Sequence, residues 1–163
     1  MGATAHALEN PIGKPQIVSG MEVSAVYLQP IEMEPAGMMS SAATSDIHLE
    51  ADIKATADNA NGFAEGDWLP NLMVTYELRK KGADQVVSGV LMPMVASDGP
   101  HYGDNVKLMG PGRYNLRLLI TPADPLHPFG RHVDKETGVQ PWPMPFWIKS
   151  EFVFAGVGKK GGY

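Results

Sequence analysis

Short stretches of alternating apolar and polar residues dominate the chain. In the clearest one, DIHLEADIKA (46–55), the odd-numbered positions 47 to 53 are apolar, whereas the even-numbered positions 46 to 52 carry a carboxylate or an imidazole. A repeat of two residues places alternate side chains on opposite faces of a β-strand. Comparable segments are MEVSAVYLQPIEM (21–33), NLMVTYELRK (71–80), QVVSGVLMPM (85–94), GRYNLRLLIT (112–121) and PFWIKSEFVFAGV (145–157). No apolar pattern of period 3.6 is long enough for a major helix.

Turn-forming residues separate these segments. The chain holds 18 Gly and 14 Pro, and turn signals occupy 59–66, 80–84, 97–103 and 110–112. Six or seven strands at this spacing predict an all-β sandwich of two packed antiparallel sheets. Residues 122–145 form a long Pro-rich connection, and a connection of that length without secondary structure is usually functional or mobile.

Composition and charge narrow the classes of function. The 163 residues suffice for one domain with a sizeable core, and the hydrophobic share of 44% is that of a folded protein. The formal net charge is −5 without a long basic run, which argues against nucleic acid or an anionic membrane surface as partner. No apolar run approaches the roughly 18 to 20 residues that span a bilayer. The first residues also lack the pattern of a signal peptide.

The chain contains no cysteine but ten Met and five His. Disulfides, thiolate catalysis and cysteine-based metal centres are therefore excluded, and a transition-metal site would use imidazole, thioether and carboxylate. His48 and Glu50 lie two residues apart, so both side chains leave the same face of the predicted strand 46–55. The alternative is an ordinary solvated strand face, which we prefer for Asp46 and Asp52.

Two further candidate ligands flank the predicted turn 97–103. Met94 ends a strand in the run LMPM, and His101 lies in DGPHYG, a loop stiffened by Gly and Pro that lowers the entropy cost of holding a ligand. His132 lies in a second Gly-bounded loop, GRHVDKETG. A buried Met and exposed His residues are the simpler alternative.

The segment IEMEPAGMMSS (31–41) interleaves Glu and Met. It could bind a second, more labile cation, although Met-rich segments also pack against one another. We find no GxSxG, GxxxxGK[ST] or HExxH motif, so no hydrolase, P-loop or zinc-protease signature is present.

Several long runs resemble the periplasmic high-affinity iron-transport protein family, which is related to a spirochaete metal-binding lipoprotein antigen. They include SDIHLEADIKA, GDWLPNLMVTYEL, MPMVASDGPHYGDNVKLMGPGRYNL, GRHVDKETGV and FVFAGVGKKGGY, and the resemblance extends from about Val23 to Tyr163. It implies an immunoglobulin-like antiparallel β-sandwich, a homodimer and a periplasmic location. On this basis residues 1–20 are an N-terminal extension and residues 21–163 a single metal-binding domain.

The resemblance also implies a copper site near the dimer interface. Its ligands match His48, Glu50, Met94, His101 and His132, and Asp98 matches a neighbour of His101. Glu34 matches a possible second metal site for iron. Imidazole and thioether ligands suit copper independently of the family, because thioethers favour Cu(I) and imidazole also accepts Cu(II). Copper affinity is expected to fall below about pH 6.5, where imidazole protonates. His132 could reach the partner's site through the long connection.

These residues leave three functions open. The first is a copper- and iron-binding component that delivers Fe²⁺ to an inner-membrane iron permease. The second is a copper oxidoreductase acting on iron, or a copper-handling protein, and the third is an immunoglobulin-like adhesion module without a metal. The clustering of His and Met at predicted strand ends and rigid loops argues against the third.

Overall fold

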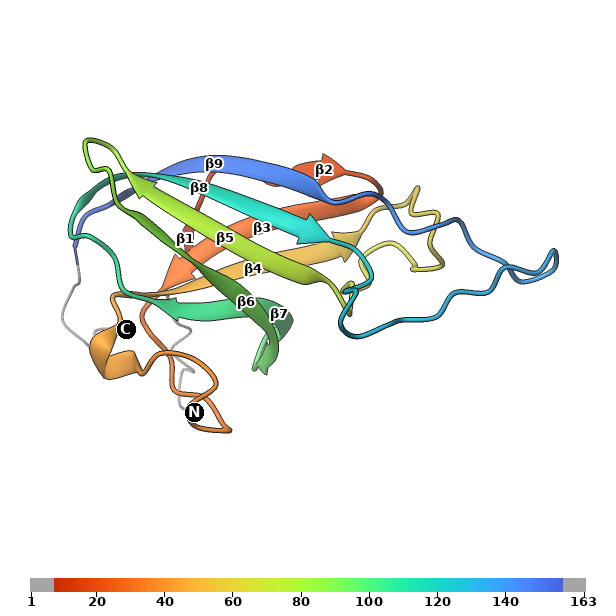
Figure 1. Ribbon diagram of the computed structural model, residues 1–163, viewed down its shortest axis with the longest axis horizontal. Helices are drawn as coiled ribbons and strands as arrows, with labels where there is room; N and C mark the ends of the chain where they lie inside the picture. Colours follow the sequence, from red (N-terminus) through yellow and green to blue (C-terminus); the bar gives the residue numbers. More distant parts are fainter. Residues whose placement is uncertain (1–7, 157–163) are drawn as a thin grey trace, which may run out of the picture.

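The computed structural model of the protein describes residues 8–156 and is all-β in that range, apart from one short 3₁₀ helix (Figure 1). The elements are β1 (Asn10–Pro11), β2 (Gln16–Val18), β3 (Met21–Leu28), η1 (Ala42–Thr44), β4 (Ile47–Ala55), β5 (Met73–Lys80), β6 (Val86–Ala96), β7 (Gly99–Val106), β8 (Gly112–Thr121) and β9 (Phe146–Phe154). Within these residues no helix is long and apolar enough to cross a membrane.

All strands belong to one antiparallel sheet that curls on itself. The order is β1-β3-β4-β7-β6-β5-β8-β9, and β2 also pairs with β3. The curl occurs in β6, whose residues 86–91 pair with β5 whereas residues 92–96 pair with β7. Opposite ends of the sheet then meet through side chains: Gln16 Nε2 donates to Lys149 O at 3.0 Å and Tyr27 Oη donates to Val153 O at 3.4 Å. The result is a half-barrel.

The predicted apolar faces form the core. Ile47, Leu49, Ala51 and Ile53 of β4 are buried, as are Tyr114, Leu116, Leu118 and Ile120 of β8. Complete burial of each Leu or Ile contributes about 1.5–3 kcal/mol, so these alternating positions fix which face of each strand turns inward. The all-β prediction is confirmed, and the immunoglobulin-like arrangement stays a prediction.

The predicted turn 97–103 is wrong for most of its residues. Only Ser97 and Asp98 form the turn, and β7 begins at Gly99, paired with Ala96. Gly and Pro disfavour strands, but residues 99–103 of β7 pair with β6 and residues 102–106 pair with β4, and this pairing outweighs the weak strand propensity. His101 is therefore a strand residue and not a loop residue.

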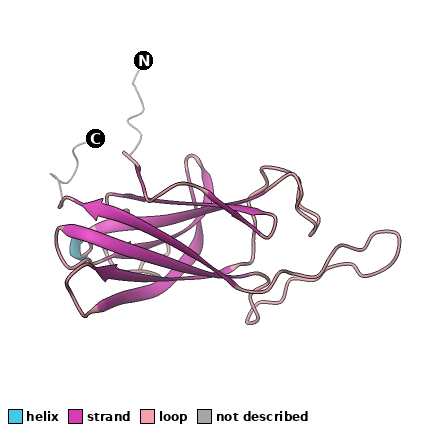
Figure 2. Ribbon diagram, turned by 90° about the horizontal axis from the view of Figure 1, so that it is seen from above, coloured by secondary structure: helices cyan, strands magenta, loops and turns pink. Residues whose placement is uncertain are grey.

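Two other segments differ in extent from the prediction. The strand predicted at 21–33 ends at Leu28, and β1 and β2 lie within the predicted extension 1–20. The predicted strand 145–157 corresponds to β9, and its last residue, Val157, lies outside the described residues. Residues 122–145 contain no strand or helix and project beyond the sheet, as Figure 2 shows.

Candidate metal centre

Three predicted ligands converge between β4 and β7. The register pairs His48 with Asn105 and Glu50 with Gly103, so residues 101, 103 and 105 share a face with residues 48 and 50. Glu50 Oε1 lies 3.5 Å from His48 Nε2 and 3.3 Å from His101 Nε2. One ligand atom from each of the three residues lies within 4.8 Å of the others, which is close enough to hold one metal ion.

Met94 joins this group from β6, where it pairs with His101. A Cβ atom added at Gly103 would lie 2.7 Å from His48 Nε2 and 3.1 Å from Met94 Sδ. The thioether and the imidazole therefore border the same small hollow, which exists because residue 103 has no side chain. The structure thus brings together four of the predicted ligands: His48, Glu50, Met94 and His101.

Asn105 orients the ring of His48. The Asn105 Nδ2 amide donates to Ile31 O at 2.8 Å and to Ser40 O at 3.0 Å, so its Oδ1 is the atom that accepts from His48 Nδ1 at 2.9 Å. With the proton on Nδ1, the lone pair of His48 Nε2 points into the site. A metal-binding His is commonly fixed in this way through its other ring nitrogen.

The two imidazoles are poised for a cation. His48 Nε2 and His101 Nε2 are both buried and have no hydrogen-bond partner among the described residues. Such an unpaired polar atom costs about 1–3 kcal/mol, and coordination to a metal ion would remove that cost. Neutral imidazole and thioether are soft or intermediate ligands, so the donor set fits copper better than Ca²⁺ or Mg²⁺.

Burial sets the protonation of the site. It lowers the pKa of His48 to about 4, against the opposing hydrogen bond to Asn105, and it lowers the pKa of His101 against the charges of Asp52 and Asp98. Burial also raises the pKa of Glu50 to about 8, with the charge of Asp52 adding to it. At pH 7 these shifts favour two neutral imidazoles and a protonated Glu50 carboxyl group.

The site opens into an acidic cleft of about 1100 Å³. Glu9, Glu32, Glu34, Glu50 and Asp98 line the cleft, together with His48, Met94 and His101, and no Lys or Arg among residues 8–156 does so. Glu34 therefore lies in the same cleft as the predicted copper ligands. A concave surface of one charge sign concentrates ions of the opposite sign, so this cleft attracts cations.

His132 is remote from this cluster within one chain. It lies on the projecting connection 122–145, where its side chain is 75% exposed and its Nδ1 donates to Thr137 Oγ1 at 2.8 Å. It does not line the cleft. A single subunit thus assembles the predicted site without this ligand.

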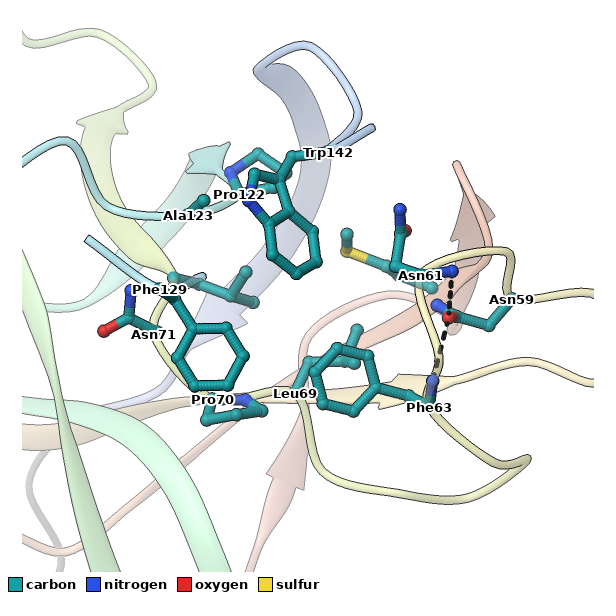
Figure 3. A pocket seen from close by; sticks show the side chains of 12 residues that line it. Asn59, Asn61, Phe63, Leu69, Pro70, Asn71, Pro122, Ala123, Phe129 and Trp142 are labelled. Carbon is teal, nitrogen blue, oxygen red and sulfur yellow. Dashed lines mark hydrogen bonds between the residues drawn. The ribbon is translucent and has the colours of Figure 1, made fainter. Parts of the chain in front are cut away.

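The base of the connection is fixed to the sheet (Figure 3). Phe129 and Trp142 contact each other and line an apolar pocket with Phe63 and Leu69. Asn61 Nδ2 donates to Gln140 O and Pro141 O, both at 3.0 Å. These contacts hold the two ends of the connection and direct its middle part, with His132, away from the body.

Asn105 and Gly103 were missed by the sequence analysis. Both lie in β7, which was predicted to begin as a turn, so the alternation His101–Gly103–Asn105 was not recognised as one strand face. With β7 as a strand, the spacing of two residues would have placed both beside His101.

Comparison with known proteins identifies the family of this chain. The profile of the Fe²⁺ transport protein family matches residues 6–156. The chain belongs to this family. A UPF0423 protein of Brucella abortus is 64% identical over 161 residues, which cover 98% of this chain and 88% of that protein. The 34 kDa membrane antigen of Treponema pallidum is 44% identical over 135 residues, which cover 80% of this chain and 65% of the antigen.

Two solved structures are similar to this chain, and one of them contains copper. The copper-reconstituted P19 protein of Campylobacter jejuni is 49% identical with a TM-score of 0.89, and the match covers 93% of this chain and 99% of P19. FetP of uropathogenic Escherichia coli strain F11, recombinantly expressed in the periplasm, is 47% identical with a TM-score of 0.88, at the same coverage of 93% and 99%. The predicted resemblance to the iron-transport family is therefore confirmed.

Proposed function

We propose that this protein is a periplasmic copper- and iron-binding component of high-affinity ferrous iron uptake that delivers iron to an inner-membrane permease. The observation that carries the proposal is the pair of buried, unpartnered Nε2 atoms of His48 and His101 beside Glu50 and Met94. The family match supports iron transport, and the expression of FetP in the periplasm supports the location.

Copper is the resident metal in this proposal. His48, His101 and Met94 hold it, and Glu50 offers a harder oxygen ligand at 3.3–3.5 Å from the two imidazoles. Thioether and imidazole together accept both Cu(I) and Cu(II), so bound copper supplies a one-electron couple. The chain itself binds and orients: Asn105 fixes His48, and the acidic cleft draws cations to the site.

A homodimer completes the copper site. His132 is exposed on a connection that is anchored at its base and projects from the body, so it is placed to reach another subunit (Figure 1). We assign a further ligand, in addition to the four of one chain, to His132 of the partner subunit. The immunoglobulin-like arrangement of the sheet belongs to the same proposal.

Iron is the cargo and binds in the acidic cleft. Glu34, Asp98 and Glu50 supply carboxylate oxygens there, and Fe²⁺ accepts these harder ligands alongside imidazole. Iron and copper would then occupy neighbouring positions along one cleft. The inner-membrane permease would receive Fe²⁺ from the open side of the cleft.

Titrations with Cu²⁺ and with Mn²⁺ as a redox-inert substitute for Fe²⁺ test this function. His101→Ala should weaken Cu²⁺ binding by at least about 100-fold, because it removes a buried ligand. Glu34→Ala should weaken Mn²⁺ binding and leave Cu²⁺ binding unchanged. His127→Ala, an exposed histidine outside the cleft, is the matched control. Equal copper affinity of wild type and His101→Ala would place the copper site elsewhere.

A copper oxidoreductase acting on iron is the second candidate function. The observation that favours it is that the four ligands border an open cleft, so a substrate ion has access to them. Oxygen consumption with Fe²⁺ that depends on copper and continues over many turnovers supports the enzyme. Stoichiometric binding of both metals without turnover supports the carrier.

A further inference from the structure

The loop before β4 gathers three thioethers around a second cavity. Residues 31–42 enclose a space of about 180 Å³, and Met33, Met38 and Met39 all line it. Met33 and Met39 are half-buried, whereas the Met38 side chain is 49% exposed. Methionine side chains that are partly exposed to solvent contribute little to packing. In this position they can be reached by a soft metal ion.

Asn105 ties this loop to the copper site. Its Nδ2 donates to the carbonyl groups of Ile31 and Ser40, which lie at the two ends of the loop, and its Oδ1 also accepts from Ile31 N at 3.2 Å. The same Oδ1 accepts from His48 Nδ1. One buried amide thus fixes both ends of the methionine loop and the orientation of a copper ligand. The loop and the copper site therefore keep a fixed position relative to each other.

The two cavities share a wall. Ile31, Glu32 and Met33 line both the methionine cavity and the acidic cleft, and Met94 lines the cleft beside the copper ligands. Met33, Met38 and Met39 thus line the methionine cavity, and Met33 also lines the cleft that holds Met94. Glu32 adds a negative charge at the shared wall, which favours a cation over a neutral ligand.

We propose that Met33, Met38 and Met39 form a loading site for Cu(I), from which the ion passes to Met94, His48 and His101. Thioethers bind Cu(I) in preference to Cu(II), Fe²⁺ or Zn²⁺, so the loop would take up only the reduced ion. The transfer is a ligand exchange in which Cu–S bonds to the loop break as bonds to Met94 Sδ and the imidazole nitrogens form, and no electron moves. This loading site goes beyond the proposed function, because its three ligands take no part in the copper centre or in iron binding.

Cu(I) binding to the whole protein, measured anaerobically in competition with bicinchoninate, tests the proposal. Wild type should bind two Cu(I) per chain, and Met33→Leu/Met38→Leu/Met39→Leu should bind one with the affinity of the buried site unchanged. His101→Ala should retain the loop ion and lose the buried one. Leu keeps the volume of Met without the sulfur, so the fold is maintained. Met144→Leu, an exposed methionine on the far connection, is the control.

Methyl resonances of ¹³C-labelled methionine give a second readout with Ag(I), a redox-inert analogue of Cu(I). Signals lost in single Met→Leu variants assign the residues, and those of Met33, Met38 and Met39 should shift together. Met38→Leu alone, at a half-exposed position, should slow loading of the buried site several-fold without altering thermal unfolding. One Cu(I) per wild-type chain, or equal loading rates with and without the three sulfurs, would overturn the loading site and leave the copper centre untouched.

Discussion

At the residue scale, the protonation of the Glu50 carboxyl group controls how metal binding in the cleft depends on pH. Burial raises its pKa to about 8, whereas His48 and His101 are kept neutral by the same burial. A metal ion that binds Glu50 must therefore displace a proton from the carboxyl group and not from an imidazole. The pH dependence of metal binding is thus expected at a higher pH than the value of about 6.5 that free imidazole would give.

Copper binding at pH 7 should release close to one proton per site in the wild type and none in Glu50→Gln. Between pH 8 and pH 6 the copper affinity of the wild type should fall about 50-fold in total, because the Glu50 proton competes with the metal over this range. The affinity of the Gln variant should change much less there, since burial lowers the pKa of His48 to about 4 and also lowers the pKa of His101. Calorimetry in buffers of different ionisation enthalpy measures the proton. Identical proton release by both proteins would exclude Glu50 as the titrating ligand.

Gly103 has a second role at the residue scale, because it leaves the hollow beside His48 and Met94 open. Gly103→Ala should reduce copper affinity by about 10- to 100-fold, since overpacking of this kind costs about 1–3 kcal/mol and here falls on two ligand atoms. Gly130→Ala adds a Cβ in open space and is the control. A competition titration with a copper chelator measures both. Wild-type affinity in Gly103→Ala would show that the ion lies away from this hollow.

At the scale of elements, β7 organises the site. It carries His101, Gly103 and Asn105 on one face, between β4 with His48 and Glu50 and β6 with Met94. Since all three strands are hydrogen-bonded over the site, the ligands have little freedom to move apart. The arrangement is that of a preformed site, which lowers the entropy cost of binding.

Asn105→Ala should lower copper affinity by about 10- to 100-fold and destabilise the fold by about 1–3 kcal/mol, because it leaves His48 Nδ1 and two loop carbonyl groups without their partner. Asn105→Asp keeps an acceptor for His48 but cannot donate to Ile31 and Ser40. It should therefore retain most copper affinity while amide exchange in residues 31–42 accelerates. Asn115→Ala, exposed on β8, serves as the control. Equal copper affinities for Asn105→Ala and wild type would contradict the orienting role.

At the scale of the whole molecule, the proposed copper ligands lie on two different segments. Four candidate ligands meet at β4, β6 and β7, whereas His132 is exposed on the connection between β8 and β9. A second subunit would supply what one chain leaves out. Occupancy of the site would then depend on protein concentration whenever the dimer dissociates.

Mixed dimers test whether His132 acts across the interface. When His132→Ala and His101→Ala chains are combined, the site of the His132→Ala chain still has His101 and receives His132 from its partner. One of the two sites per mixed dimer should then regain wild-type copper affinity, although neither parent protein binds copper tightly. If His132 served its own chain, no mixed dimer would contain a complete site. Native mass spectrometry with Cu²⁺ distinguishes the two results.

The sequence predicted the structure well where apolar residues alternate along a strand. It predicted the structure less well where contacts with distant segments determine the conformation. Alternation in 46–55 and 112–121 correctly indicated the apolar face that forms the core, but it did not indicate that His48 and Glu50 on the opposite face of 46–55 are buried as well. β7 was not recognised because its Gly, Pro, Asp and Asn residues suit a turn, and only its pairing on both sides makes it a strand. The raised pKa of Glu50 could not be read from the sequence either, because it depends on burial between strands that are distant along the chain.

Because Glu50 is protonated before copper binds, the net charge of the proposed site with copper bound depends on the oxidation state of copper. Exchange of one proton for Cu(I) leaves the local charge unchanged, whereas exchange for Cu(II) adds one positive charge at the floor of an otherwise acidic cleft. A cation arriving in that cleft is repelled by the oxidised site and not by the reduced one. In the proposed site, the oxidation state of copper would thus change how strongly the cleft holds a second cation, through charge alone and without movement of the strands.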